Sequence, residues 1–421
     1  MNLKSELDKS FTEVDITPEE LLKNQKEFLK NSKILLDFNC DKLPNFYASC
    51  KQHKTPPKFR YITSTCKAAT KPLNRILKGT FKTIQKEVIR FCDVEDYKRH
   101  DNINTCWIID NNTYVRKDIF KLNRGFYKAK SVNSFDFDTL YTNIPHNILK
   151  FVIASIIKNS FETSGKKFIR VTKSFKGTFS DSDRKYKGTY ILTEDDIIKL
   201  FDYMIDNCYI VYKSKVYRQT IGIPMGVDPA PFIANLFLHY YENSYMNSLI
   251  DSRNLNLALK LSHVFRYLDD LLNLNDLGIF QQVSKIIYPK ELILSRTNIS
   301  DLQSDYLDLN ICCENESFSY KLFDKRDNFD FDVINFPCMK YSNIPTKPSY
   351  GIYLSQLIRI CRNCTYVDDF NYSVNKLTLE FLNKSFSKKY LNKIYLKFID
   401  NYETEWCKFG VLPDIPHSLT R

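Results

Sequence analysis

Two adjacent aspartates, Asp269 and Asp270, interrupt an otherwise largely apolar stretch and limit how this chain can fold more than any other feature. Apolar runs flank them at residues 264–268 and 271–274. Such short runs, broken at one acidic point, predict two buried strands joined by a tight turn. Two carboxylates at about 4 Å repel each other by roughly 1 to 4 kcal/mol, depending on the dielectric. A turn at the edge of a core therefore requires water or a cation, and ligands that are all oxygen favour Mg²⁺.

The same Tyr-x-Asp-Asp pattern recurs at residues 366–369, but in different surroundings. It follows the cysteine-bearing segment 361–364 and leads into polar residues, where the first copy leads into an apolar strand. We therefore interpret Asp368 or Asp369 as the cap of a helix that runs from about residue 371 to about residue 400. The lysines of that helix fit a solvated surface and a phosphate-binding face equally well.

A site for two metal ions requires a further carboxylate, and Asp136 is the best candidate. It lies in segment 134–143, where polar and apolar residues alternate ahead of Pro145, and this pattern predicts a strand followed by a turn and a helix. Taken alone, Asp136 is equally well explained as an exposed strand residue. The chain has only 10 glycines and none forms a glycine-rich phosphate loop, so a nucleotide site must be built in another way.

Length and composition set the broad class of the protein. With 421 residues, of which 43% are hydrophobic, the chain can form about two to four packed subdomains. Its net charge of +12 favours a polyanionic partner such as nucleic acid, although charge alone does not distinguish nucleic acid from a membrane surface. The chain has neither a long uncharged apolar run nor an apolar core in residues 1–11, so we expect no membrane span and no signal peptide. The 12 cysteines are then expected to be free thiols, and Cys361 and Cys364 lack the second pair that a zinc ribbon needs.

Three further segments have a local interpretation. Thr193 and Asp196 match a capping box at the start of a helix predicted over residues 197–205. Apolar residues after Pro231 recur at helical spacing and predict one helix face packed on a core. Residues 160–187 are rich in Ser, Lys, Gly and Asp, so we expect a solvated insertion there.

The order and spacing of these segments resemble those of reverse transcriptases, in particular those of Penelope-like retroelements, which are relatives of telomerase. The similarity covers roughly residues 43–366. Segments that resemble the three palm motifs of the family are 134–145, 223–237 and 265–270. Segments that resemble its fingers motifs are 46–54 and 59–62, and the similarity continues downstream at 306–309 and 349–357. Met225 stands where many reverse transcriptases have glutamine, and methionine is common there in Penelope-like proteins.

The resemblance implies an α+β fold, the right-hand polymerase with fingers, a palm of antiparallel sheet plus helices, and a helical thumb. The expected boundaries are an N-terminal helical extension at residues 1–40, fingers at 41–130, palm at 131–330, and thumb with C-terminal helices at 331–421. The palm would contain a basic insertion near residues 160–190.

The resemblance also implies a role for each site residue. Asp136 and Asp269 would hold two Mg²⁺ ions, with Asp270 supporting them. Tyr141 would be a steric gate, because an aromatic ring beneath the sugar leaves no room for a 2′-hydroxyl.

Other residues would contact the substrate. Those implied to meet the triphosphate are Arg60 and, with it, Lys51 and Lys58. Those implied to form a small-residue surface against the templating base pair are Gly226, Ala230 and Pro231. The general acid that protonates pyrophosphate would be either Lys290 or Arg296.

The reaction implied is attack of a DNA primer 3′-hydroxyl on the α-phosphate of a dNTP, templated by RNA and also by DNA. The compartment is left open, with an intracellular location, and the nucleus in particular, as the candidate. Gly351-Ile352-Tyr353 has no Tyr-Ile-Gly partner downstream, so we expect no GIY-YIG endonuclease. Two alternatives stay open: a catalytically inactive, domesticated nucleic-acid-binding protein, and an RNA-dependent RNA polymerase on a similar palm.

Overall fold

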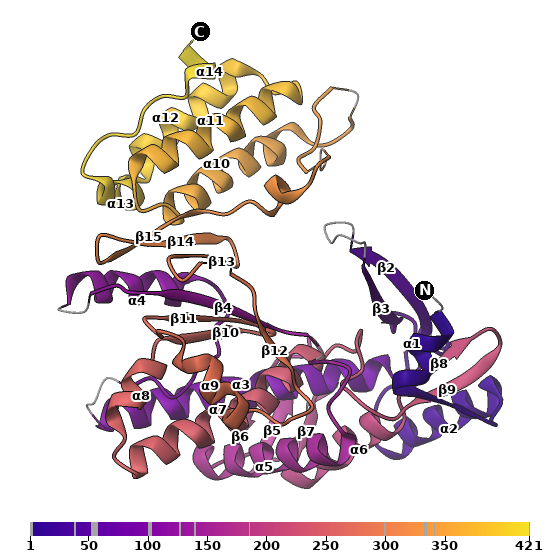
Figure 1. Cartoon of the computed structure of the whole chain (residues 1–421). Coiled ribbons are helices and arrows are strands. Elements are labelled where there is room, and N and C mark those ends of the chain that lie inside the picture. Colours follow the sequence, from indigo (N-terminus) through magenta and orange to yellow (C-terminus); the bar gives the residue numbers. More distant parts are fainter. Residues whose placement is uncertain are drawn as a thin grey trace. The chain divides into compact units, whose positions relative to one another are not determined.

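The computed structural model describes residues 3–37, 39–51, 58–99, 103–125, 128–138, 140–184, 186–298, 300–331, 333, 335–340 and 342–420. Helices and largely antiparallel sheets are mixed along the chain, as in an α+β fold (Figure 1). The chain divides into two compact units. The first unit comprises Met1–Ile109, Asp136–Leu271 and Gly278–Ser295, and the second comprises Asp110–Phe135, Leu272–Leu277 and Arg296–Arg421.

The N-terminal part of the first unit contains a strand as well as the expected helices. Helices α1 (Leu3–Ser10) and α2 (Pro18–Asn31) flank strand β1 (Phe11–Val14). That strand joins a five-stranded sheet of order β1-β9-β8-β2-β3, formed with β9 (Lys215–Gln219), β8 (Tyr209–Tyr212), β2 (Asn45–Lys51) and β3 (Lys58–Ser64). An ion pair of 2.5 Å between Lys215 and Glu13 crosses from β9 to β1. The expected extension of helices at residues 1–40 therefore contributes a sheet edge to the first unit.

The helices of the first unit form most of its core. Besides α1 and α2, they are α3 (Lys71–Arg99), α5 (His146–Ser164), α6 (Glu194–Asp206), α7 (Ala230–Asp251), α8 (Leu255–Leu261) and α9 (Ile279–Ile287). The predicted capping box at α6 is confirmed, since the Thr193 hydroxyl accepts from the Asp196 N–H at 3.1 Å and the Asp196 carboxylate accepts from the Thr193 N–H at 3.0 Å. The helix predicted after Pro231 is also present, but residues 233–239 are all buried, so α7 is enclosed on every side there.

The expected solvated insertion is a folded sheet. Strands β5 (Phe168–Val171), β6 (Gly177–Ser180) and β7 (Tyr190–Leu192) form an antiparallel sheet of order β6-β5-β7 that packs on α3. Ile169 and Val171 point into the core and are fully buried. The polar residues lie on the exposed side and in the connections of this small sheet, so the segment is solvated as expected but is also folded.

The acidic pair lies in a second sheet, as the sequence predicted. Strands β10 (Val264–Tyr267) and β11 (Asp270–Leu274) are the two runs around Asp269, and β4 (Val132–Phe137) is the predicted strand of Asp136. With β12 (Leu294–Arg296), the strand order is β10-β11-β4-β12. The sheet thus places β4 directly beside the strand that begins with Asp270.

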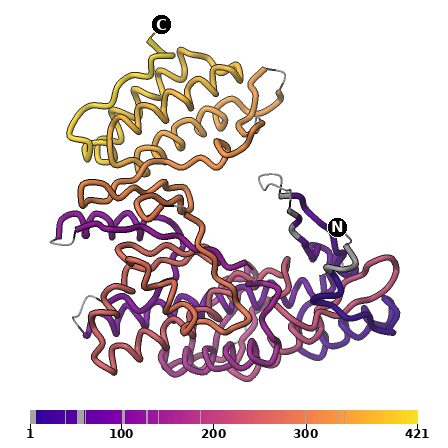
Figure 2. The backbone as a smooth tube through the Cα atoms, viewed as in Figure 1, coloured from indigo at the N-terminus to yellow at the C-terminus, as the bar shows by residue number. Residues whose placement is uncertain are grey.

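The second unit combines a small sheet with a bundle of helices. Its elements are α4 (Thr113–Arg124), β13 (Gln303–Tyr306), β14 (Leu309–Glu314), β15 (Ser317–Leu322), η1 (Lys325–Asn328), α10 (Thr346–Arg362), α11 (Val367–Asn383), α12 (Lys388–Asn401), α13 (Glu403–Trp406), η2 (Cys407–Phe409) and α14 (His417–Thr420). Figure 2 shows α10, α11 and α12 side by side in orange and yellow. The single helix predicted from about residue 371 is wrong. The chain breaks between α11 and α12 at residues 384–387, where Ser385 has φ +64° and Phe386 is buried.

The cysteines follow the sequence expectation. All 12 cysteines are free, and Cys361 and Cys364 are fully buried in the apolar core of the helical bundle. Among the described residues, no helix combines the length and the apolar character that crossing a bilayer requires.

Candidate active site

The turn between β10 and β11 carries two of the predicted carboxylates. Leu268 and Asp269 connect the strands, and Leu268 has φ +56°. A positive φ fits the first central residue of a two-residue hairpin turn, where glycine or asparagine is usual. For leucine this conformation costs roughly 1 to 2 kcal/mol, so the surrounding structure must hold it. The tight turn leaves Asp269 at the tip and Asp270 at the start of β11, both partly exposed.

Asp136 approaches this turn through the backbone of β4. The Phe137 N–H donates to the Asp269 carbonyl oxygen at 3.3 Å. The Phe137 ring packs edge-on against Tyr288, with ring centroids 4.9 Å apart and both side chains buried. Because side chains alternate along a strand, the neighbouring Asp136 points to the opposite face of the sheet, where it is partly exposed. The structure thus brings together, at backbone level, the two acidic segments that lie far apart in the sequence.

The donor set of these aspartates suits a hard divalent cation. Among the described residues, no three His, Cys, Asp or Glu side chains are gathered in an arrangement that could hold a metal ion. Mg²⁺ is usually bound by one or two carboxylates together with substrate phosphates, and seldom by a complete protein cage. Carboxylate oxygens from Asp136 and Asp269, on adjacent segments and accessible to solvent, therefore fit such a partial shell.

Tyr141, the predicted gate, lies in a turn that is bound to the second palm segment. The Tyr141 carbonyl accepts from the Ile223 N–H at 2.9 Å, and the Gly222 N–H donates to the Ile144 carbonyl at 2.8 Å. His146 Nε2 donates to the Gly222 carbonyl at 2.9 Å. Burial lowers the pKa of His146, which keeps the imidazole neutral near pH 7. The position of Tyr141 is therefore set by its contacts with the loop that precedes α7.

Gly226 has a packing role that the resemblance did not imply. Its φ is +106°, and a Cβ added there would lie 2.0 Å from the Thr63 carbonyl oxygen at the end of β3. The Thr63 N–H donates to the Met225 carbonyl at 3.3 Å, and the Thr65 hydroxyl donates to the Gly226 carbonyl. Only glycine permits this approach of two backbones.

The other substrate candidates are placed as follows. Ala230 is 4% exposed at the start of α7, whereas Gly226 and Pro231 are exposed. In the β2–β3 hairpin, Lys51 is opposite Lys58 and Arg60 is opposite Ser49. Residues 52–57 between these strands lie outside the described part. Of the two candidate general acids, Arg296 binds Asp301 at 2.6 Å, and Lys290 is exposed.

Sequence reasoning missed the buried partners of the hairpin. Arg266 and Glu242 are both fully buried and form a bidentate ion pair, with N···O distances of 2.6 and 2.9 Å. The only sequence signal was an arginine inside an otherwise apolar strand, because nothing in the sequence indicates which residue of α7 would face it.

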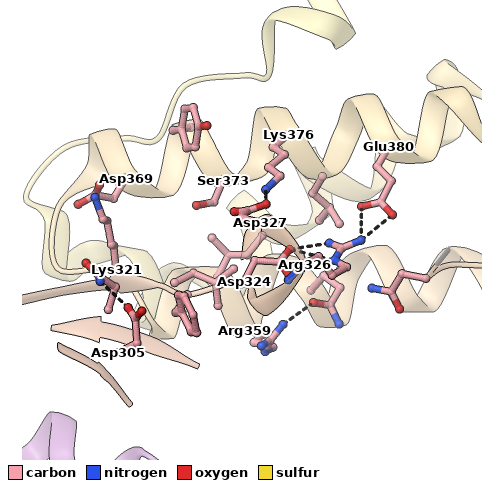
Figure 3. Close-up of a pocket in the computed structure, with 18 of the residues that line it drawn as sticks. Asp305, Lys321, Asp324, Arg326, Asp327, Arg359, Asp369, Ser373, Lys376 and Glu380 are labelled. Carbon is pink, nitrogen blue, oxygen red and sulfur yellow. Dashed lines mark hydrogen bonds and ion pairs between the residues drawn. The ribbon is translucent and has the colours of Figure 1, made fainter. Parts of the chain in front are cut away.

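The second Tyr-x-Asp-Asp lies beside a polar pocket of about 380 Å³ in the second unit (Figure 3). Tyr366 is the N-cap residue of α11, and Asp368 and Asp369 occupy its first turn without capping it. The prediction that either aspartate caps the helix is therefore wrong in position, although carboxylates in the first turn still stabilise the helix dipole. Burial raises the pKa of Asp369.

Three of the cations that line this pocket are paired with carboxylates. Arg326 binds Asp324 at 2.7 Å and Glu380 at 2.9 Å, as the dashed lines in Figure 3 show. Lys376 pairs with Asp327, and Arg359 binds Asp308 at 3.2 Å. Because these cations are neutralised by protein carboxylates, the pocket is a weaker candidate for an anionic substrate than the hairpin site.

Comparison with known proteins identifies the fold. No protein-family model matches the sequence, and no curated protein matches it. The solved structure of telomerase from Candida albicans with a TWJ fragment of telomeric RNA is similar, with 14% identity, 97% of this chain and 69% of that chain covered, and a TM-score of 0.57. Telomerase from Candida tropicalis with the same kind of RNA fragment gives 12% identity, coverages of 99% and 62%, and a TM-score of 0.47.

The likeness to the first of these structures shows the fold. The chain has the α+β right-hand fold of nucleic-acid polymerases, with antiparallel sheets and helices, as the sequence resemblance implied. At 14% identity, the comparison extends to the fold alone.

Proposed function

We propose that this chain is an RNA-templated DNA polymerase that transfers nucleotides from dNTPs to the 3′-hydroxyl of a DNA primer. The observation that carries the proposal is the hydrogen bond from Phe137 to Asp269, which joins the strand of Asp136 to the acidic turn. Two acidic segments on adjacent strands of an antiparallel sheet, within a polymerase fold, supply the carboxylates that metal-assisted nucleotidyl transfer requires.

Each residue has one task in this proposal. Asp136 and Asp269 hold two Mg²⁺ ions, and Asp270 supports them. Bound Mg²⁺ would lower the pKa of the attacking hydroxyl and neutralise charge on the leaving pyrophosphate. Tyr141 restricts the sugar to deoxyribose.

Basic residues bind the polyanionic substrates. Arg60, with Lys51 and Lys58, is assigned to the triphosphate, since guanidinium binds phosphate oxygens in a bidentate way. The net charge of +12 favours the RNA template and the DNA primer. The narrower assignment to Penelope-like retroelements rests on the sequence motifs, including Met225 in the second palm segment.

Primer extension on an RNA template with Mg²⁺ and dNTPs tests this function. We expect the natural chain to extend the primer and Asp269→Ala to lose activity by at least about a thousandfold, the scale of removing a metal ligand from a two-metal site. Asp369→Ala is the matched control, because it changes the second Tyr-x-Asp-Asp and should leave extension intact. Equal incorporation by the natural chain and Asp269→Ala would refute the assignment.

A polymerase that prefers ribonucleotides is the alternative with a specific test. The same assay with rNTPs in place of dNTPs would reveal it, because ribonucleotides would then be incorporated more efficiently. The aromatic side chain at Tyr141 argues against this outcome.

A further inference from the structure

A fully enclosed group of polar side chains lies beside the acidic turn of the first unit. We call Arg266, Glu242, Asn235 and Tyr288 the Arg266 network. The Arg266 guanidinium donates to both Glu242 oxygens, at 2.6 and 2.9 Å, and to the Asn235 side-chain oxygen at 2.8 Å. It also donates to the Asn235 carbonyl at 3.0 Å, so α7 holds this guanidinium through three acceptor groups.

The Arg266 network is hydrogen-bonded to the turn that carries Asp269. Arg266 Nη1 donates to the Leu268 carbonyl oxygen at 3.2 Å. The backbone of Arg266 is fixed in turn, because its N–H donates to the Trp107 carbonyl at 2.7 Å and its carbonyl accepts from the Ile109 N–H at 3.0 Å. Leu268 has the positive φ that must be held by its surroundings. The guanidinium therefore braces the strained residue next to Asp269.

The Arg266 network also contacts the strand of Asp136. The Tyr288 hydroxyl donates to Glu242 at 2.8 Å. Burial, and after it the charge of Glu242, raises the pKa of Tyr288, so the hydroxyl keeps the proton that it donates. The Tyr288 ring packs against Phe137, the residue that follows Asp136 and donates to Asp269. Both acidic segments are thus supported by side chains bonded to the same glutamate.

Packing alone does not explain such a group. Taking two charges out of water is costly, and apolar residues of similar volume often serve stability as well or better. The geometry also requires arginine, because its planar guanidinium donates to Glu242, Asn235 and Leu268 at the same time. The ammonium group of a lysine at position 266 could not make all of these bonds.

We propose that Arg266, Glu242 and Tyr288 are positioning residues that hold the Asp269 turn and the Asp136 strand in the mutual geometry that binds divalent metal. The proposal rests on the proposed function for the role of that metal in catalysis. Its test measures metal binding directly, apart from nucleotide transfer.

The experiment titrates the full chain with Mn²⁺ and follows free Mn²⁺ by electron paramagnetic resonance, with Asp269→Ala defining binding at the acidic turn. Arg266→Lys keeps the charge but loses the fork, and we expect its Mn²⁺ dissociation constant to rise about tenfold, as for the loss of partners that orient metal ligands. Tyr288→Phe keeps the ring against Phe137 and removes only the hydrogen bond to Glu242. It should shift the constant in the same direction by a smaller factor.

Tyr353→Phe is the matched control for Tyr288→Phe. Tyr353 is buried like Tyr288, and its hydroxyl lies 2.7 Å from the Thr378 hydroxyl in the helical bundle of the second unit. We expect this control to lower the melting temperature about as much as Tyr288→Phe and to leave Mn²⁺ binding unchanged. In primer extension, Tyr288→Phe should lower kcat with KM for dNTP unchanged, because the network does not contact the nucleotide.

The outcomes separate this proposal from the proposed function. If Arg266→Lys folds and binds Mn²⁺ like the natural chain, the positioning role is wrong. If that variant does not fold, Tyr288→Phe decides, and unchanged Mn²⁺ binding with a lowered melting temperature shows a purely structural role. Asp269-dependent Mn²⁺ binding without primer extension refutes the polymerase function alone, whereas a natural chain that extends the primer without such binding refutes the positioning role alone.

Discussion

In the proposed function, Tyr141 is the residue on which the choice of sugar depends. Its carbonyl accepts from the Ile223 N–H, and this bond does not involve the Tyr141 side chain. Tyr141→Ala should therefore fold normally and accept ribonucleotides, with the preference for dNTP over rNTP falling at least about tenfold through loss of steric exclusion. Single-nucleotide incorporation with matched dNTP and rNTP gives the ratio. A natural chain that already favours rNTP would contradict the role of Tyr141.

A substitution at Gly226 tests whether the close approach of two backbones stabilises the loop before α7. Gly226→Ala places a methyl group against the Thr63 carbonyl at a position with φ +106°, so we expect a loss of about 3 kcal/mol or more in the free energy of unfolding. Gly351→Ala is the control, because Gly351 lies exposed inside α10 with no atom near the added Cβ. It should stabilise the protein by about 1 kcal/mol through helix propensity. Chemical denaturation measures both, and similar effects would contradict the packing role.

At the scale of elements, sequence patterns correctly predicted those helices and strands that depend on interactions between residues close in the sequence. The hairpin around Asp269, the strand of Asp136 and the capped helix α6 follow from alternation, charge placement and the Thr193–Asp196 pair. Strand β1 was missed because four residues carry too little periodicity, and its partner β9 lies far along the chain. The break at Ser385 was missed because the apolar spacing continues on both sides of it. Long-range pairing determines strand β1, and no local pattern encodes that pairing.

In the candidate site, too, some residues could be identified from the sequence and others could not. Its carboxylates could be named from the sequence because acidic residues among apolar ones stand out. The partners of Arg266 could not be named, because α7 offers many positions and only packing selects Asn235 and Glu242. The packing role of Gly226 could not be predicted either, since its close neighbour Thr63 lies on strand β3, far away in the sequence.

The two cysteines in helix α10 and the segment after it should differ from the exposed Cys66 in their reactivity. Burial raises the pKa of Cys361 to about 12 and that of Cys364 to about 11, so neither forms a thiolate near pH 8. Cys66 is exposed, and a hydrogen bond from Ser64 lowers its pKa. Because the thiolate is the reactive form, iodoacetamide should modify Cys66 well before either buried thiol. Mass spectrometry of a time course measures this order. Rapid modification of Cys361, or zinc retained by the purified chain, would contradict the buried-thiol interpretation.

At the scale of the whole molecule, the fold and the net charge both support the proposed function. The right-hand polymerase fold and the net charge of +12 are independent properties, one of topology and one of composition. Their combination fits a protein that holds nucleic acid while a small site performs the chemistry. The small site is assigned to the place in the first unit where the strand of Asp136 is hydrogen-bonded to the turn of Asp269.

Binding of shared metal ions by Asp136 and Asp269 can be observed directly by anomalous diffraction. The crystals would contain the chain with a primer on an RNA template, Mn²⁺ and a non-hydrolysable dNTP analogue. We predict two manganese peaks beside the nucleotide phosphates, with carboxylate oxygens of both Asp136 and Asp269 at about 2.1 Å. Manganese bound elsewhere, or an Asp136 carboxylate turned away from ions that Asp269 holds, would contradict the account.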